Sequence, residues 1–145
     1  MTEQAHEFMV GPGQGREAGA GPNRLTMKVG PESGGRQLGI FESAFPPGAG
    51  AFAHRHGTYE EAFYVLEGEI EYRLGDERVV ATVGSCVFVP AGVAHGFRNV
   101  GEAEAQHLVM VTPMRALEMV EELFRAGPER RAEVLAKHDS ELVDP

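Results

Sequence analysis

Two histidine-bearing segments that lie far apart in the sequence most constrain how this chain can fold. The first runs from Gly48 to Gly68 and contains His54 and His56, and the second runs from Gly84 to Asn99 and contains His95. Side chains two residues apart in an extended strand point to the same face, so His54 and His56 can share one ion. All three histidines serve one site only if the chain folds back and brings the two segments together.

The residue types of these segments suit a transition metal. Imidazole nitrogen and carboxylate oxygen together suit zinc and the divalent first-row metals, whereas calcium and magnesium prefer mostly oxygen ligands. A strand that returns across the sheet would add Glu61 and His95 to the histidine pair. Three imidazoles and one carboxylate leave about two positions open on a six-coordinate ion, and open positions are typical of a catalytic site.

A plainer interpretation is that these residues hold no ion. Two histidines at this spacing occur by chance, and a lone histidine such as His95 is more often a core or surface residue. The turn residues favour the metal site, because Gly68, Gly84 and Pro90 each fall where a strand-turn-strand layout needs a bend near the histidines.

Short apolar segments separated by turn residues predict an all-β fold. Alternation of apolar and polar residues predicts a hairpin of Leu25–Val29 and Arg36–Glu42, with its turn at Gly34 and Gly35. Further strands are expected at 62–66, 70–74, 79–81, 87–89, 97–100 and 108–111, and a short one at 6–10. Such a series is typical of a sandwich or a barrel.

The hydrophobic period changes from that of a strand to that of a helix after Thr112. Thr112 is expected to cap a helix that starts at Pro113 and stops before Gly127, and a second helix is expected over 129–138. The first helix carries an apolar stripe of Leu117, Val120, Leu123 and Phe124. This stripe predicts a helix that packs on the barrel rather than one that binds a partner.

Length and composition predict a single domain. The 145 residues, 42% of them apolar, suffice for one core and are too few for two ordinary domains. We expect a flexible arm or short strand over 1–23, a barrel over 24–112 and a helical segment over 113–145. The chain shows neither a long apolar run nor an export signal, so no membrane contact and a cytoplasmic location are expected. Cys86 lies in an apolar stretch and is expected to be buried in the core.

The net charge bears on the choice of partners. The chain has 13 Lys and Arg against 22 Asp and Glu, a net charge of −9, and its acids are scattered with no basic cluster. A nucleic-acid surface needs a concentration of Lys and Arg. We therefore expect a small-molecule substrate and no nucleic-acid partner.

Both histidine segments resemble the two sequence motifs of the cupin superfamily. The residues that match the first motif are His54, His56, Glu61 and Gly68, and those that match the second are Gly84, Pro90, Gly92, His95 and Asn99. The resemblance implies a double-stranded β-helix, which is a jelly-roll barrel around a small-molecule cavity. It also implies that the metal ligands are His54, His56, Glu61 and His95. Glu61 takes this role rather than Glu60, because Glu61 has the family's spacing to Gly68.

Among cupins, the chain resembles small single-domain proteins of the quercetin dioxygenase-like group. This resemblance implies a dioxygenase with one divalent Mn, Fe, Ni, Co or Zn ion per chain that acts on a phenolic or enolic substrate. Small polyketide-cyclase cupins are also similar and imply, as an alternative, a zinc-dependent cyclase or isomerase of aromatic natural-product biosynthesis. A non-catalytic cupin that binds or senses a small molecule is a third alternative. The family resemblance also implies a homodimer.

Aromatic and sulfur side chains predict a largely apolar cavity and a hydrophobic substrate. These residues are Phe41, Phe52, Phe63, Tyr64, Tyr72, Phe88, Phe97 and Met110. Gln37, Glu42 and His107 are further candidates for polar groups near the metal or the cavity, and His6 and His138 rank below them. Glu61 is the expected catalytic residue, since a carboxylate that leaves the metal can take a proton from a phenol or enol.

Overall fold

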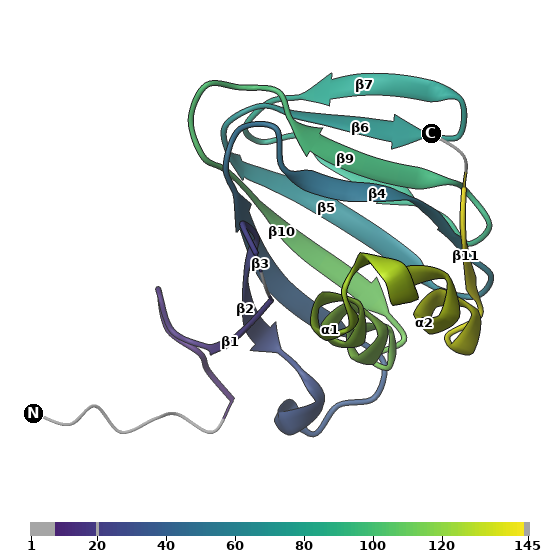
Figure 1. The fold of residues 1–145 in the computed structure, drawn as a ribbon. Coiled ribbons are helices and arrows are strands. Elements are labelled where there is room, and N and C mark those ends of the chain that lie inside the picture. The colour runs from purple at the N-terminus through teal and green to yellow at the C-terminus, as the bar shows by residue number, and fades with distance from the viewer. Residues whose placement is uncertain (1–7, 20, 144–145) are drawn as a thin grey trace, which may run out of the picture.

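Two antiparallel sheets face each other in the computed structural model, which describes residues 8–19 and 21–143 (Figure 1). The six-stranded sheet has the order β1 (Arg16–Ala18), β2 (Arg24–Val29), β3 (Gly39–Phe45), β10 (Ala105–Thr112), β5 (Glu60–Glu67) and β8 (Cys86–Val89). The five-stranded sheet has the order β11 (Ser140–Leu142), β4 (Gly50–His56), β9 (His95–Asn99), β6 (Ile70–Leu74) and β7 (Glu77–Ala81). The expected all-β jelly roll is confirmed.

Alternating side chains place the core between the two sheets. On β10 the buried positions are Ala105, His107, Val109 and Val111, and the residues between them are half-buried. Because successive side chains of a strand point to opposite faces, His107 and Val109 share the inner face of the sheet. Ile70 of β6 is fully buried and faces them from the other sheet. Complete burial of such a side chain contributes roughly 1.5–3 kcal/mol to folding.

The turn between β5 and β6 requires a glycine at position 68. Gly68 has a φ of 80°, in the left-handed region. A Cβ on Gly68 would lie 3.0 Å from the Cα of Ala105, closer than real Cβ atoms usually approach. The turn carries the chain from the sheet that holds Glu61 into the sheet that holds the histidine strands.

The helices lie together at the end of the molecule opposite β6 and β7 (Figure 1). They are α1 (Ala116–Ala126) and α2 (Arg131–Lys137), and two short 3-10 helices span Pro31–Ser33 and Pro128–Arg130. Leu117 and Met119 of α1 are buried in the core. Neither α-helix of the described residues is long and apolar enough to cross a membrane.

The predicted start of the first helix is wrong. Thr112 does not cap a helix but is the last residue of β10, where it pairs with Glu60 of β5. The helix begins at Ala116, after Arg115, and no side chain caps it. The reason is that the β10 ladder continues to the end of the neighbouring strand, and these hydrogen bonds satisfy the backbone that a helix would otherwise use.

Both sheets extend beyond the segment in which strands were expected. At one end β1 pairs with β2, and at the other end β11 pairs with β4. Of the strand expected at 6–10, residues 6 and 7 lie outside the described residues, and 8–10 are not in a strand. A strand of three residues, such as β11, is too short for its alternation to be recognised in the sequence.

Cys86 was expected in the core, and this expectation is wrong. Its side chain is exposed on β8. Val87 and Val89 of β8 are the buried residues, so the alternation of the strand turns Cys86 and Phe88 outward. Apolar composition alone did not reveal which of the two faces of this strand is covered.

Candidate metal centre

The structure brings His54, His56, Glu61 and His95 together. His54 and His56 lie on β4, and His54 is the register partner of His95 on the neighbouring strand β9. Glu61 reaches the histidines from β5 in the facing sheet. One potential ligand atom from each of the four residues lies within 4.8 Å of the others, and all four residues are buried.

Backbone carbonyl groups fix the orientation of two of the rings. The Nδ1 atom of His54 lies 2.8 Å from the carbonyl oxygen of Phe52, and the Nδ1 atom of His95 lies 2.9 Å from that of Val93. A carbonyl oxygen only accepts hydrogen bonds, so each Nδ1 carries the proton and donates it. In the neutral ring the lone pair is then on Nε2, which is the atom available to a metal.

A serine from the C-terminal strand fixes the third ring. The Nδ1 atom of His56 lies 2.8 Å from the hydroxyl oxygen of Ser140, and this hydroxyl donates its proton to the carbonyl oxygen of His138 at 3.1 Å. The serine oxygen therefore accepts from His56, and the lone pair of that ring is also on Nε2. Sequence reasoning missed Ser140, which lies 84 residues from His56 and belongs to no recognisable motif.

The contacts of Glu61 call for a cation between the four side chains. Its Oε1 atom lies 2.7 Å from Nε2 of His56 and 3.7 Å from Nε2 of His95. These two buried Nε2 atoms have no hydrogen-bond partner. With both rings protonated on Nδ1, lone pairs would face one another at these distances and repel. A single proton could bridge one such pair, whereas a divalent transition metal accepts lone pairs from all four residues.

Burial and mutual electrostatics keep the cluster in the protonation state that a metal requires. Burial lowers the pKa of His54 to about 3, and the neighbouring rings of His95 and His56 add to this effect. Burial by itself favours a neutral Glu61, but the facing rings of His56 and His95 outweigh it and hold the pKa of this carboxyl group well below 4.5. At neutral pH a carboxylate and at least one neutral imidazole are therefore present, as metal binding needs.

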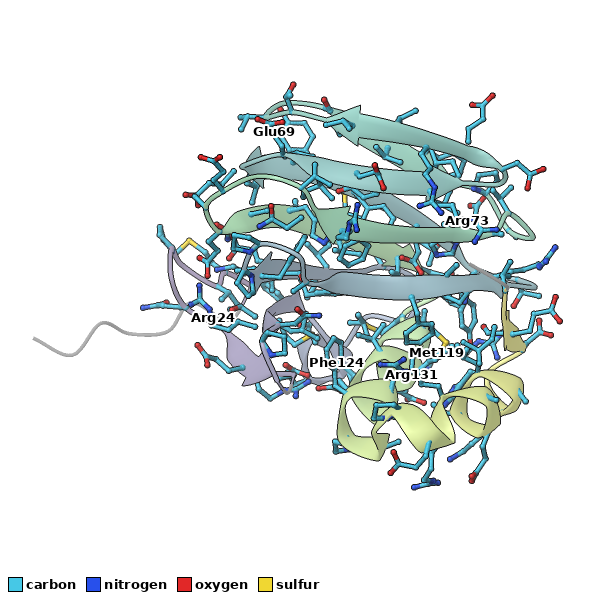
Figure 2. All side chains as sticks on the ribbon, turned by 45° about the horizontal axis from the view of Figure 1, so that its top comes forward. Arg24, Glu69, Arg73, Met119, Phe124 and Arg131 are labelled. Carbon is cyan, nitrogen blue, oxygen red and sulfur yellow. The ribbon has the colours of Figure 1, made fainter. Side chains whose placement is uncertain are left out.

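The cluster lies on the wall of a cavity of about 550 Å³, a common size for a small-molecule site. Its aromatic wall consists of Phe41, Phe52, Phe63 and Phe97, and α1 covers it with Met119, Val120, Leu123 and Phe124. Figure 2 shows Met119, Phe124 and Arg131 on the side of the helices that faces the sheets. The guanidinium group of Arg131 stacks over the ring of Phe52, with 4.4 Å between its carbon and the ring centroid.

A model of the cupin domain matches residues 41–111, a segment that contains the whole four-residue cluster. The chain belongs to the cupin superfamily. Among solved structures, this cupin is similar to an RmlC-like cupin from Shewanella frigidimarina NCIMB 400, with a TM-score of 0.65 and 23% identity. The match covers 79% of this chain and 96% of that chain, and it shows the fold alone.

Two further relatives of this cupin are polyketide proteins. It is 34% identical over 88 residues to the polyketide synthase CurC of Streptomyces cyaneus. The match covers 61% of this chain and 54% of CurC, so the cupin spans about half the length of that relative. It also matches the polyketide cyclase RemF from Streptomyces resistomycificus, with a TM-score of 0.59 and 25% identity over 79% of this chain and 80% of RemF.

The other candidate polar residues of this cupin lie outside the cluster. Gln37 is exposed before β3. Glu42 of β3 is half-buried, forms an ion pair with Lys28 at 3.4 Å and accepts a hydrogen bond from Gln106 at 3.3 Å. It occupies an outward position, because its neighbours Phe41 and Ser43 are the buried residues of this strand.

The remaining histidines differ from one another. His138 lies 2.7 Å from Glu122 of α1 and is not part of the cluster. His6 lies outside the described residues. His107 lines the cavity but does not belong to the four-residue cluster.

The structure also sorts the aromatic residues that the sequence left unassigned. Tyr64 and Phe88 are 41% and 57% exposed and point away from the core. Tyr72 is buried without lining the cavity. The cavity of this cupin is thus aromatic on several sides, with the cluster and His107 as its buried polar groups among the described lining residues.

Proposed function

We propose that this cupin is a metal-dependent cyclase or isomerase that acts on an aromatic polyketide precursor. The observation that carries the proposal is the convergence of three Nε2 atoms and one carboxylate on the wall of an aromatic cavity. The polyketide relatives CurC and RemF support this choice of substrate class.

The four residues of the cluster would hold one divalent transition metal. Such a metal supplies Lewis acidity, which lowers the pKa of acidic C–H and O–H groups of a bound β-diketone or phenol. The donor set fits Zn and the other first-row metals, and it does not choose among them.

Glu61 is the residue placed to move the proton. It takes a proton from the carbon between two carbonyl groups, and that carbon then forms a C–C bond to a second carbonyl carbon of the same chain. The new alkoxide oxygen takes up a proton, and loss of one water completes the ring. A carboxylate held by His56 and His95 is a weak base, so Glu61 gains basicity when it separates from their rings. The aromatic walls hold the flat substrate and exclude water.

The experiment compares protein purified without added metal, analysed for its metal content, with two variants at neighbouring positions. Glu61→Gln replaces the buried carboxylate, and Glu60→Gln replaces the exposed carboxylate beside it. We expect anaerobic conversion of a linear aryl polyketone, with loss of one water detected by mass spectrometry. Glu61→Gln should reduce turnover by about 10²–10⁴-fold, and Glu60→Gln should leave it unchanged. Full turnover by metal-loaded Glu61→Gln contradicts the proposal.

A quercetinase-like dioxygenase is the second candidate, since the four-residue ligand set leaves positions open for a substrate and dioxygen. The two polyketide relatives favour the cyclase over it. Oxygen uptake on mixing with a flavonol would favour the dioxygenase, and tight binding of either substrate without product would favour a sensing protein. The homodimer and the absence of a nucleic-acid partner stay predictions, which sedimentation velocity with and without DNA would check.

A further inference from the structure

His107 is a buried polar ring in an aromatic part of the cavity wall. It is 0% exposed and lines the cavity from β10. Its ring centroid lies 5.2 Å from that of Phe45, 5.1 Å from that of Phe63 and 4.7 Å from that of Phe97. Apolar surroundings of this kind make an unpaired ring nitrogen costly, so both nitrogens of His107 call for a partner.

The partner of one nitrogen fixes the position of the ring proton. Nδ1 of His107 lies 2.7 Å from the hydroxyl oxygen of Tyr72, which is itself 1% exposed. Among the described residues, the Tyr72 hydroxyl has no other hydrogen-bond partner. If Nδ1 carried the proton, the tyrosine proton would have no acceptor. The tyrosine therefore donates to Nδ1, and the proton of the neutral ring is on Nε2.

The Nε2 atom of His107 has no hydrogen-bond partner. Tyr72 does not line the cavity and His107 does, so the ring edge opposite Nδ1 is the edge that faces the cavity. Burial lowers the pKa of His107 to about 3, which keeps the ring neutral at physiological pH. The cavity thus offers one N–H group without an acceptor of its own.

We infer that the His107–Tyr72 pair is a second recognition point for the substrate, at which Nε2–H donates a hydrogen bond to a carbonyl or phenolate oxygen. The inference rests on the proposed function and adds a specificity-determining residue to it. His107 is the register partner of Val65, whereas Glu61 is the partner of Val111. The two side chains therefore project from levels roughly 13 Å apart along the strands. Phe63 and Val109 lie between these levels and would contact a flat apolar body with an oxygen at each end.

The first test needs neither a variant nor a ligand. Long-range proton–nitrogen NMR of the folded protein reports which nitrogen of a neutral histidine is protonated. We expect His107 to be protonated on Nε2, and Tyr72→Phe, which removes only the hydroxyl group, to abolish this preference. Protonation of His107 on Nδ1 in the unaltered protein would overturn the inference.

The second test compares two ligands that differ by one oxygen. A hydroxyanthraquinone has a carbonyl oxygen on the far side from its hydroxyl group, and the matching hydroxyanthrone lacks it. We expect the unaltered protein to bind the quinone about tenfold more tightly than the anthrone, as one hydrogen bond warrants. His107→Leu should remove this preference, and His107→Gln, which keeps an N–H donor near Nε2, should restore part of it.

A control at the neighbouring inward position separates recognition from packing. Val109→Ala also changes the cavity wall, and it should weaken binding of both ligands alike while keeping the preference for the quinone. Lack of preference in the unaltered protein, or an unchanged preference in His107→Leu, overturns the inference. The titrations are run with zinc-loaded and metal-free protein. Independence of metal in all variants points to failure of the proposed function, whereas independence of His107 points to failure of this inference.

Discussion

The two polar ends of the cavity use buried histidines in opposite ways. At one end, the Nδ1 atoms of His54 and His95 donate to backbone carbonyl groups, and their Nε2 atoms converge with Glu61. At the other end, His107 accepts a hydrogen bond on Nδ1 from Tyr72, and its Nε2 stands alone among aromatic rings. The rings are equally buried, but the partner on Nδ1 reverses the role of Nε2 from lone pair to donor.

This difference teaches what distinguishes a candidate metal ligand from another buried histidine. Burial is common to both ends, and it lowers the pKa of His54 and His107 alike, to about 3. Only at the cluster do an acceptor on the far side of each ring and a carboxylate on the near side coincide. The orientation of the lone pairs therefore matters more than burial.

Removal of one converging nitrogen should have the largest effect. His95→Ala should weaken zinc binding by more than roughly 100-fold, because loss of an outer partner alone costs about 10–100-fold. Competition with a chromogenic chelator measures this affinity. His138→Ala removes a histidine that is not part of the cluster and serves as the matched control. Equal zinc affinity in the two variants would contradict the assignment of the cluster.

Loss of the outer partner of one ring should have an intermediate effect. Ser140→Ala removes the acceptor of the His56 Nδ1 proton and should weaken zinc binding by about 10–100-fold without removing a ligand. Ser85→Ala removes a hydroxyl that accepts from the backbone of Thr82 in a turn, and it should leave zinc affinity unchanged. The same chelator competition compares the two. Unchanged affinity in Ser140→Ala would mean that β11 does not support the site.

Acidification should expose the opposite end of the cavity with the smallest effect. The folded-state pKa of His107, lowered by burial to about 3, lies below the ordinary value of 6.5. Below pH 6.5 the unfolded chain therefore binds a proton that the folded protein refuses, so stability is complete above this pH and falls as the pH drops toward 3.

Urea unfolding of metal-free protein across this pH range measures the effect. The stability of His107→Gln should fall less steeply with decreasing pH than that of the unaltered protein, by about 1.4 kcal/mol per pH unit. The comparison uses slopes, so any constant loss of stability in the variant cancels. Parallel curves would show that the burial of His107 does not depress its pKa.

Local patterns predicted most of the strands because the alternation of apolar residues depends only on the chain itself. The strands around Ile70, Val87 and Val109 lie where the pattern placed them. The pattern did not settle which face of a strand is covered, as Cys86 shows, because a strand has two faces and burial depends on its neighbours. It also did not reveal where a ladder ends, as Thr112 shows.

The sequence by itself determined the all-β fold and the four residues of the candidate metal centre, because the spacing of His54 and His56 and the two cupin motifs are local patterns. Only the tertiary structure decided which nitrogen of each ring faces the cavity. That choice depends on Ser140 and Tyr72, which lie 84 and 35 residues from the histidines that they contact. Hydrogen bonds between such distant residues form when sheets pack, and no local periodicity encodes them.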